Sequence, residues 1–412
     1  MNPDPPSVLD IFTDPAVMAD PYPLYRKLLT DRPVHDIGGP IALTRYADVR
    51  AALLHPSLSS DDRHDNNQRR MARSGELTPE QVAMLGRRSF LHRDPPDHTR
   101  LRGVVCNAVM LHRSESLSVD VQRIVDESLD TVAERGVIEL IADLAYPLPL
   151  TIICQVLGIR PTDHLAAPWW RSQLCADFEA PAVAGDECSE YSRKVQHDMI
   201  ARFDDIIDAT RRHRRRGEDV LSALITASER GELTAAEVND SCRLLLISAH
   251  ETTTSLIANG MLALLRNKDQ LRLLRDDPAL ATSAVEEVLR YDTPVQFTRR
   301  IAAKDAEING IRIASGQMLM LWLAAANRDP DRFANPDRFD INRADNQHLG
   351  FGVGIHDCLA APLARLVGQI VLATLSRRLV DPDLSLDPPR YLPRAIHALE
   401  ELPVTFRGMR PA

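Results

Sequence analysis

The chain contains the stretch Phe351-Gly-Val-Gly-Ile-His-Asp-Cys358, followed directly by the apolar run LAAPLARLVGQIVLATL. Gly352 and Gly354 permit tight turns and a close approach of the backbone to a flat ligand. Cys358 then lies at the start of a predicted helix, whose free N–H groups and positive dipole end stabilise a thiolate. An ordinary loop-to-helix turn with a buried cysteine has the same pattern, so the stretch needs support from elsewhere in the chain.

Two other sites are disfavoured for this loop. A phosphate-binding loop needs a Gly-Lys-Ser/Thr sequence after its glycines, and none follows here. A zinc site needs two further ligands clustered with His356 and Cys358, and the sequence offers none nearby.

A second segment lies inside a long predicted helix. Thr234-Ala-Ala-Glu237 forms a capping box, and the helical pattern then runs to about Arg266, a length of about 45 Å. In its middle stands His250-Glu251-Thr252-Thr253-Thr254, where hydroxyls are expected to bond back to carbonyls. A carboxylate beside a hydroxyl suits proton delivery to a bound ligand, and a solvated helix turn has the same composition. A zinc-protease motif is excluded because Thr254 stands where a second His is required.

Two more segments carry charge at helical spacing. Glu287 and Arg290 are three residues apart and share a helix face, as in many surface ion pairs. In Asp94-Pro-Pro-Asp-His98-Thr-Arg100-Leu-Arg102, His98 and Arg102 lie one turn apart. That pair suits anion binding, although it is also compatible with a solvated first turn of a helix.

In this order and at these separations, the four segments resemble the cytochrome P450 family, specifically its soluble bacterial type, over about residues 10–408. The resemblance implies a mainly α fold with minor β, in which residues 1–412 form a single domain around a buried haem b. FGxGxHxC resembles the loop that carries the thiolate ligand of haem iron. The usual Gly two places after the cysteine is Ala360 here, a tolerated change.

The resemblance also assigns roles to individual residues. Cys358 is expected to be the axial iron ligand, and Glu251 and Thr252 the acid–alcohol pair that supplies protons. Four side chains are expected to pair with the haem propionates, namely His98, Arg102, Arg300 and His356. A buried structural network is expected to hold the haem loop, with the members Glu287, Arg290 and, from Pro336-Asp-Arg-Phe339, Arg338.

Substrate contacts in this family come from a loop before the Pro turn, the long helix, the segment after ExxR and a C-terminal hairpin. The residues at these places are Leu91, Leu244, Ile247, Ser248, Val295, Phe297 and Ile396. Most of them are apolar, which predicts a hydrophobic or amphipathic substrate. Apolar residues in such elements also commonly pack in the core, so each position has that alternative.

The amino-acid composition agrees with the expected fold and function. Of the residues, 44% are hydrophobic and 26% charged, which excludes a mostly disordered chain. The net charge of -9 and the aromatic content of 5% argue against a nucleic-acid partner. Six scattered cysteines without a CxxC pair indicate a reducing compartment, and neither a signal peptide nor a membrane-spanning run is expected. We therefore expect a cytoplasmic protein.

The expected function is that of a monooxygenase that hydroxylates or epoxidises a small molecule of secondary metabolism with O2. Its electrons are expected from separate proteins, a ferredoxin and a ferredoxin reductase, because the chain carries no fused flavin domain. A non-catalytic haem-binding or recruiting module and a peroxide-driven variant are the alternatives. The sequence leaves open whether the substrate arrives free or tethered to a carrier protein, as well as its identity, the regiochemistry and the oligomeric state.

Patterning also predicts local structure. A hairpin is expected over Val34–Thr44, and strands over Ile308–Ile313 and Met318–Leu323. Residues 57–80 are expected to form a long polar loop, and the Arg-rich run 211–216 is expected to form a solvated face. Helices are expected at Tyr22–Leu29, Ala47–His55, 279–291 and from near Cys358 to Leu379.

Overall fold

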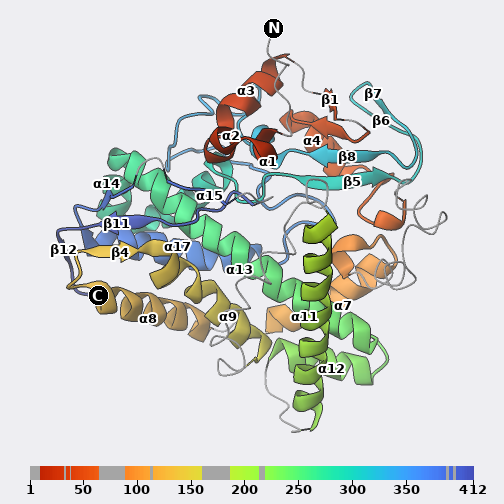
Figure 1. Cartoon of the computed structure of the whole chain (residues 1–412), viewed down its shortest axis with the longest axis horizontal. Coiled ribbons are helices and arrows are strands. Elements are labelled where there is room, and N and C mark those ends of the chain that lie inside the picture. The colour runs from red at the N-terminus through yellow and green to blue at the C-terminus, as the bar shows by residue number, and fades with distance from the viewer. Residues whose placement is uncertain are drawn as a thin grey trace.

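The computed structural model describes residues 10–31, 34–37, 39–64, 89–111, 115–159, 186–212, 219–386, 389–392 and 396–412. Helices dominate this mainly α fold, with small sheets at two sides of the helical body (Figure 1). The longer helices are α2 (Pro15–Ala19), α3 (Tyr22–Asp31), α4 (Tyr46–Leu54), α7 (Asp97–Leu111), α8 (Glu115–Val132), α9 (Pro147–Leu157), α11 (Asp186–Arg212), α12 (Val220–Glu229), α13 (Ala235–Arg266), α14 (Lys268–Asp276), α15 (Ala281–Tyr291) and α17 (Ala361–Arg378). The remaining helical segments are α1 (Asp10–Thr13), α16 (Leu323–Ala326), the single π-helical turn Ile141–Ala145, and the 3-10 turns Asp62–His64, Phe90–His92 and Pro278–Leu280.

The main sheet has five strands in the order β1-β2-β8-β5-β3. Its strands are β1 (Val34–Asp36), β2 (Ile41–Leu43), β3 (Leu58–Ser59), β5 (Thr298–Ala302) and β8 (Met318–Leu321). β2 and β8 run parallel, whereas the β1–β2 pair is the antiparallel hairpin predicted around the Gly-Gly-Pro turn. Smaller sheets join β4 (Val137–Glu139) to β11 (Pro403–Thr405) and β10 (Asp383–Leu384), and β9 (Leu379–Val380) to β12 (Gly408–Met409).

The single strand predicted over Ile308–Ile313 is wrong. The structure has two short antiparallel strands there, β6 (Ala306–Ile308) and β7 (Ile311–Ile313). Asn309 and Gly310 form the turn between them with φ angles of 50° and 85°. Asn-Gly is a strong hairpin signal because both residues tolerate positive φ. The apolar residues on both sides of it led to the prediction of one continuous strand.

Helix α13 crosses the molecule diagonally in Figure 1 and packs against α9, α11, α15 and α17. The predicted capping box is confirmed. The Glu237 side chain accepts from the Thr234 N–H at 2.8 Å, and the Thr234 hydroxyl accepts from the Glu237 N–H at 3.2 Å. Most side chains from Val238 to Leu265 are buried. A helix buried on nearly every side is a core element, so its polar residues need partners inside the protein.

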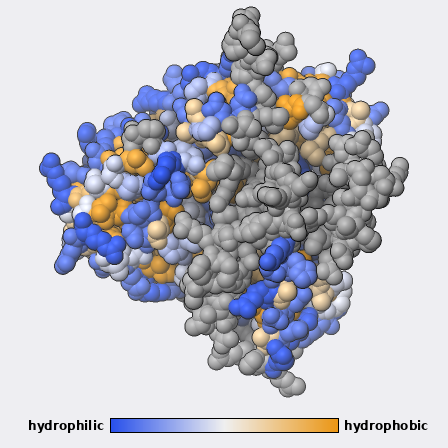
Figure 2. Space-filling view, in the orientation of Figure 1, coloured by the Kyte–Doolittle hydropathy of each residue, from blue (hydrophilic) through white to orange (hydrophobic). Residues whose placement is uncertain are grey.

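The other predicted helices agree with the structure at α3, α4, α15 and α17. Helix α17 begins at Ala361, so Cys358 lies in the turn that precedes it. Residues 65–88 and 213–218 lie outside the described residues, and with them most of the predicted polar loop and of the Arg-rich run. Among the coloured residues of the face shown in Figure 2, hydrophilic residues predominate and apolar residues are interspersed among them. Among the described helices, none combines the length and apolarity needed to cross a membrane.

Candidate functional site

The Cys358 loop has a shape that two glycines make possible. Gly352 and Gly354 have φ angles of 68° and 90°, in the region that favours glycine. A Cβ atom on Gly354 would lie 3.1 Å from Leu54 Cδ2, so the loop packs tightly on the end of α4. The Cys358 N–H donates to the Phe351 carbonyl at 2.9 Å, which closes the loop. The loop therefore presents Cys358 in a fixed backbone geometry.

The Cys358 thiol is accessible, although protein surrounds most of it. Burial raises the pKa of the Cys358 thiol, and the backbone N–H groups of Ala360 and Ala361 oppose that rise. The predicted stabilisation of a thiolate by the helix N-terminus is therefore present but smaller than the cost of desolvation. A cation bound to the sulfur would favour the thiolate far more strongly than the helix end does.

Two imidazoles and a guanidinium lie close to this loop. The rings of His98 and His356 are 4.3 Å apart, and none of their four nitrogens has a hydrogen-bond partner of normal geometry among the described residues. Arg300 is 5% exposed, and its guanidinium donates to the Arg299 carbonyl at 2.7 Å. No carboxylate in the described structure lies within ion-pair distance of Arg300.

The protein environment of these three residues disfavours positive charge on their side chains. Burial, together with the nearby Arg300, His98 and Arg102, lowers the pKa of His356 to about 3. Burial also lowers the pKa of Arg300 to about 10, against a small opposing effect of Asp94. A buried cationic group without a counter-ion is costly, and an anionic ligand relieves that cost. The donor set therefore fits the carboxylates of the expected haem.

Arg102 differs from the other three residues predicted to pair with haem propionates. It donates to the Asp357 carbonyl at 2.8 Å and forms an ion pair with the Asp357 carboxylate. The guanidinium is thus already neutralised by the loop that carries Cys358. Arg102 therefore links α7 to the Cys358 loop.

The polar segment of α13 has the predicted back-bonding. The Thr252 hydroxyl donates to the Ser248 carbonyl at 2.6 Å, and the Ser248 hydroxyl donates to the Leu244 carbonyl at 2.6 Å. Thr254 repeats the pattern by donating to the His250 carbonyl at 3.0 Å. Glu251 is 6% exposed, on a helix face next to a small cavity. A buried carboxyl group and a back-bonded hydroxyl therefore stand side by side in the centre of the molecule.

The predicted substrate-contact residues come from separate elements. Val295 and Ile396 are paired in an isolated β-bridge, which brings the segment after α15 to the C-terminal segment. The Phe297 ring packs on Trp322 with centroids 5.0 Å apart, so it takes part in an apolar cluster with the N-terminal helices. Leu91 is 39% exposed. The remaining predicted contacts lie on α13, with Ile247 buried and Leu244 and Ser248 half-buried.

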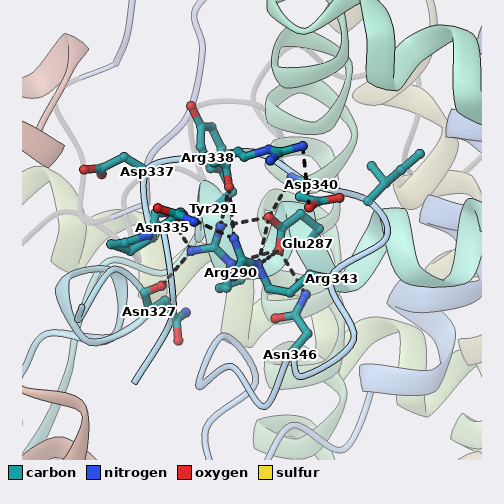
Figure 3. Close-up of polar contacts among 12 residues, drawn as sticks. Glu287, Arg290, Tyr291, Asn327, Asn335, Asp337, Arg338, Asp340, Arg343 and Asn346 are labelled. Carbon is teal, nitrogen blue, oxygen red and sulfur yellow. Dashed lines mark hydrogen bonds and ion pairs between the residues drawn. The ribbon is translucent and has the colours of Figure 1, made fainter. Parts of the chain in front are cut away.

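Glu287 and Arg290 form a fully buried, bidentate ion pair with both distances at 2.8 Å (Figure 3). Arg290 also donates to the carbonyls of Asn327, Pro336 and Arg338. These bonds satisfy the guanidinium, as a buried charge requires. The pair anchors the irregular chain between α16 and the Cys358 loop.

The third side chain of this network is Arg343, which corrects the prediction of Arg338. Arg343 Nε lies 3.1 Å from Glu287 Oε2, and the Arg343 side chain is 12% exposed. Arg338 contributes only its carbonyl, while its side chain is 66% exposed and points toward Asp340 (Figure 3). The chain turns between residues 338 and 343, so the sequence motif around Arg338 did not reveal which arginine faces inward.

A second carboxylate beside the first, Glu286, connects α15 to the two segments that flank the Cys358 loop. Glu286 accepts from Arg365 Nε at 2.7 Å, and its other oxygen lies 3.1 Å from His348 Nε2. Hydrogen bonds from His348 and Arg365 outweigh burial and lower the pKa of Glu286 to about 2. The Arg365 guanidinium also lies 4.6 Å from the ring centre of Phe351. Arg365 is therefore paired with a carboxylate, as Arg102 is.

Known proteins resemble this chain over nearly its whole length. The family sequence pattern described as Cytochrome P450 matches residues 186–380. The cytochrome P450 monooxygenase PikC of Streptomyces venezuelae is 37% identical over 96% of this chain and 93% of its own.

Solved structures agree with the sequence comparison. Mycobacterium smegmatis CYP164A2 in its ligand-free state has a TM-score of 0.87 and 36% identity, covering 96% of this chain and 99% of its own. P450BioI in complex with a hexadec-9Z-enoic acid ligated acyl carrier protein has a TM-score of 0.86 and 33% identity, covering 95% and 99%. At these identities the shared fold extends to the segments that surround Cys358.

Proposed function

Because the chain belongs to the cytochrome P450 family, we propose that it hydroxylates or epoxidises a hydrophobic or amphipathic small molecule of secondary metabolism. It is a monooxygenase, and haem b is its cofactor. The observation that carries the proposal is the group gathered beside Cys358, namely the unpartnered ring nitrogens of His98 and His356 and the buried guanidinium of Arg300, which has no carboxylate partner among the described residues. We take residues 1–412 as one domain built around that group.

Each residue near the loop has a distinct proposed task. Cys358 binds the haem iron through Sγ, and His98, His356 and Arg300 bind the propionates. Arg102 holds the Cys358 loop through Asp357 and contributes positive charge at its edge. When bound, a thiolate-ligated haem activates dioxygen for insertion of one oxygen atom into the substrate.

Glu251 and Thr252 supply the protons that oxygen activation consumes. Since the Thr252 hydroxyl donates its hydrogen to the Ser248 carbonyl, its oxygen is available as a hydrogen-bond acceptor. Glu251 is the neighbouring acid that can hold a proton, and it is shielded from bulk solvent. This division of tasks follows general acid catalysis, in which a positioned carboxyl group delivers the proton.

Substrate is proposed to contact α13 at Leu244, Ile247 and Ser248, and the bridged pair Val295 and Ile396. Val295 and Ile396 support this placement because they are held together by the β-bridge. Leu91 and Phe297 complete the proposed set, with Phe297 also packing on Trp322. The apolar character of these side chains favours apolar portions of the substrate.

Electrons are proposed to come from a ferredoxin and its reductase. The test begins with the ferric holoprotein and a screen for compounds that shift the haem from low to high spin. Compounds that do so are then incubated with 18O2, a ferredoxin and its reductase, and we expect a product that carries one 18O atom. Binding compounds that remain unoxidised under every redox condition would overturn the proposal in favour of a non-catalytic module. Product formed with peroxide alone would favour the peroxide-driven variant.

A carrier-tethered substrate is a second candidate because the similar P450BioI was solved with an acyl carrier protein bound. The two candidates differ in the chemistry of the ligand that binds. Titration of the spin shift with a free acid and with the same acyl group on a carrier protein separates them. Tighter binding of the carrier-loaded form by about tenfold, or 1.4 kcal/mol, would favour tethered delivery.

A further inference from the structure

His250 is a buried histidine that the proposed function has not yet used. It lies in the middle of α13 with no exposed surface, and its Nε2 is 3.0 Å from the Tyr146 carbonyl oxygen. The Tyr146 ring packs edge-on against the imidazole, with centroids 4.4 Å apart and an interplanar angle of 89°. These two contacts fix the orientation of the His250 ring.

The contact with Tyr146 determines the tautomer of His250. A carbonyl oxygen only accepts hydrogen bonds, so Nε2 must carry the hydrogen. Burial lowers the pKa of His250, against smaller opposing effects of Glu251 and the Tyr146 carbonyl, so the ring is neutral at pH 7. Nδ1 is therefore an unprotonated acceptor, and the described residues give it no hydrogen-bond donor.

Glu251 is the acid that Nδ1 faces. Its Oε1 lies 3.9 Å from Nδ1, so a hydrogen bond between these two atoms requires the carboxyl group to turn toward the ring. On its other side Glu251 lines a cavity of about 40 Å3, together with Tyr146, Ser255 and Glu400. The buried Ser255 hydroxyl has no hydrogen-bond partner among the described residues, and Glu400 is exposed. A cavity of this volume, with the polar groups of Glu251, Ser255 and Glu400 in its wall, has room for one or a few water molecules.

We propose that His250 is a positioning residue for Glu251, whose carboxyl group in its acid form donates a hydrogen bond to His250 Nδ1. The inference rests on the proposed role of Glu251 as proton donor. Glu251 turns away from Nδ1 to release its proton toward Thr252, and the resulting carboxylate regains a proton from water in the cavity. The cavity water in turn takes up a proton from bulk solvent, which enters the cavity past Glu400. His250 itself neither gains nor loses a proton.

The first test reads the tautomer directly. In 15N-histidine-labelled holoprotein, as the diamagnetic ferrous–CO complex, the His250 signals are assigned by their loss in His250→Gln. We expect the hydrogen on Nε2 and Nδ1 unprotonated, with the Nδ1 shift of a hydrogen-bond acceptor that changes in Glu251→Ala. A hydrogen on Nδ1, or an Nδ1 shift indifferent to Glu251→Ala, would overturn the proposal.

The second test is a double-mutant cycle on product formed per reduced nicotinamide consumed. His250→Phe keeps an aromatic ring but removes both nitrogens, and we expect a loss of about fivefold, the effect of one hydrogen bond. In the Glu251→Gln background the same change should cost nothing further. His250→Gln keeps a donor for Tyr146 and an acceptor for Glu251, so it should stay within about twofold of wild type.

An equal loss from His250→Phe in both backgrounds would show a merely structural role and overturn the proposal. Failure of the proposed function has a different signature. In that case the wild-type protein forms no product, while the tautomer measurement still decides whether His250 accepts from Glu251. Haem content and the thermal midpoint of each variant confirm that the compared proteins are folded.

Discussion

Arg343 Nε lies 3.1 Å from Glu287 Oε2, in a network where Arg290 already makes a bidentate pair with the same carboxylate. Arg343 also donates to the Ala334 carbonyl at 2.9 Å, so it connects α15 to the chain that leads into the Cys358 loop. Removing Arg343 takes a cation and a hydrogen-bond donor from the fully buried Glu287 carboxylate, whereas Arg338 has an exposed side chain and serves through its carbonyl.

We therefore expect Arg343→Ala to lower the free energy of unfolding by about 1–3 kcal/mol. The matched control, Arg338→Ala, should change it by no more than about 0.5 kcal/mol. Urea unfolding of the haem-loaded protein measures both. A larger loss from Arg338→Ala than from Arg343→Ala would show that the network has been assigned to the wrong arginine.

Glu286 gives the protein a pH-dependent contribution to stability. Its pKa in the folded protein is about 2, below the value of 4.5 for an unperturbed glutamate. A lowered pKa means that the contribution is fully present above about pH 4.5 and is lost as the pH falls toward 2. We expect Glu286→Gln to cost about 1–3 kcal/mol at pH 7, discounted for partial solvent exposure, and progressively less below pH 4.5. A cost that stays constant from pH 7 to pH 3 would contradict this account.

Arg300 should have opposite effects on the haem-free and haem-loaded protein. Its buried charge has no carboxylate partner in the described structure, so Arg300→Gln removes a desolvation cost when haem is absent. When haem is bound, the same change removes a partner of the propionates. We expect a higher thermal midpoint for the haem-free variant and a loss of haem to apomyoglobin about tenfold faster, equivalent to 1.4 kcal/mol. Slower haem loss than in wild type would exclude Arg300 from the propionate site.

Much of this arrangement was predictable from the sequence. The long helix, its capping box and the back-bonding hydroxyls follow from local patterns, because they involve residues three or four positions apart. The choice between Arg338 and Arg343 depended on how an irregular segment turns, which no periodicity encodes. The contact of His250 with Tyr146 could not be predicted either, because the two residues are 104 positions apart and only tertiary packing brings them together.

Thr252 tests the proposed proton supply. Thr252→Ala should lower product per reduced nicotinamide by about tenfold and divert the reducing equivalents to peroxide. The change removes the hydroxyl oxygen that accepts a hydrogen bond on the path of the proton from Glu251. Thr226→Ala is the matched control. Its hydroxyl donates to the Ser222 carbonyl at 2.9 Å in α12, the same kind of bond at a similarly half-buried position. Equal coupling in wild type and Thr252→Ala would refute the assignment of Thr252.

Cys358 is assigned as the thiolate ligand of the haem, and the absorption spectrum of the reduced protein under CO reports that ligand. We predict the red-shifted Soret band of thiolate ligation in wild type and in Cys106→Ser, which removes another free cysteine. Cys358→Ser should lose that band while the protein remains folded. A red-shifted band that persists in Cys358→Ser, or one that is absent from freshly reduced wild type, would exclude Cys358 as the thiolate ligand.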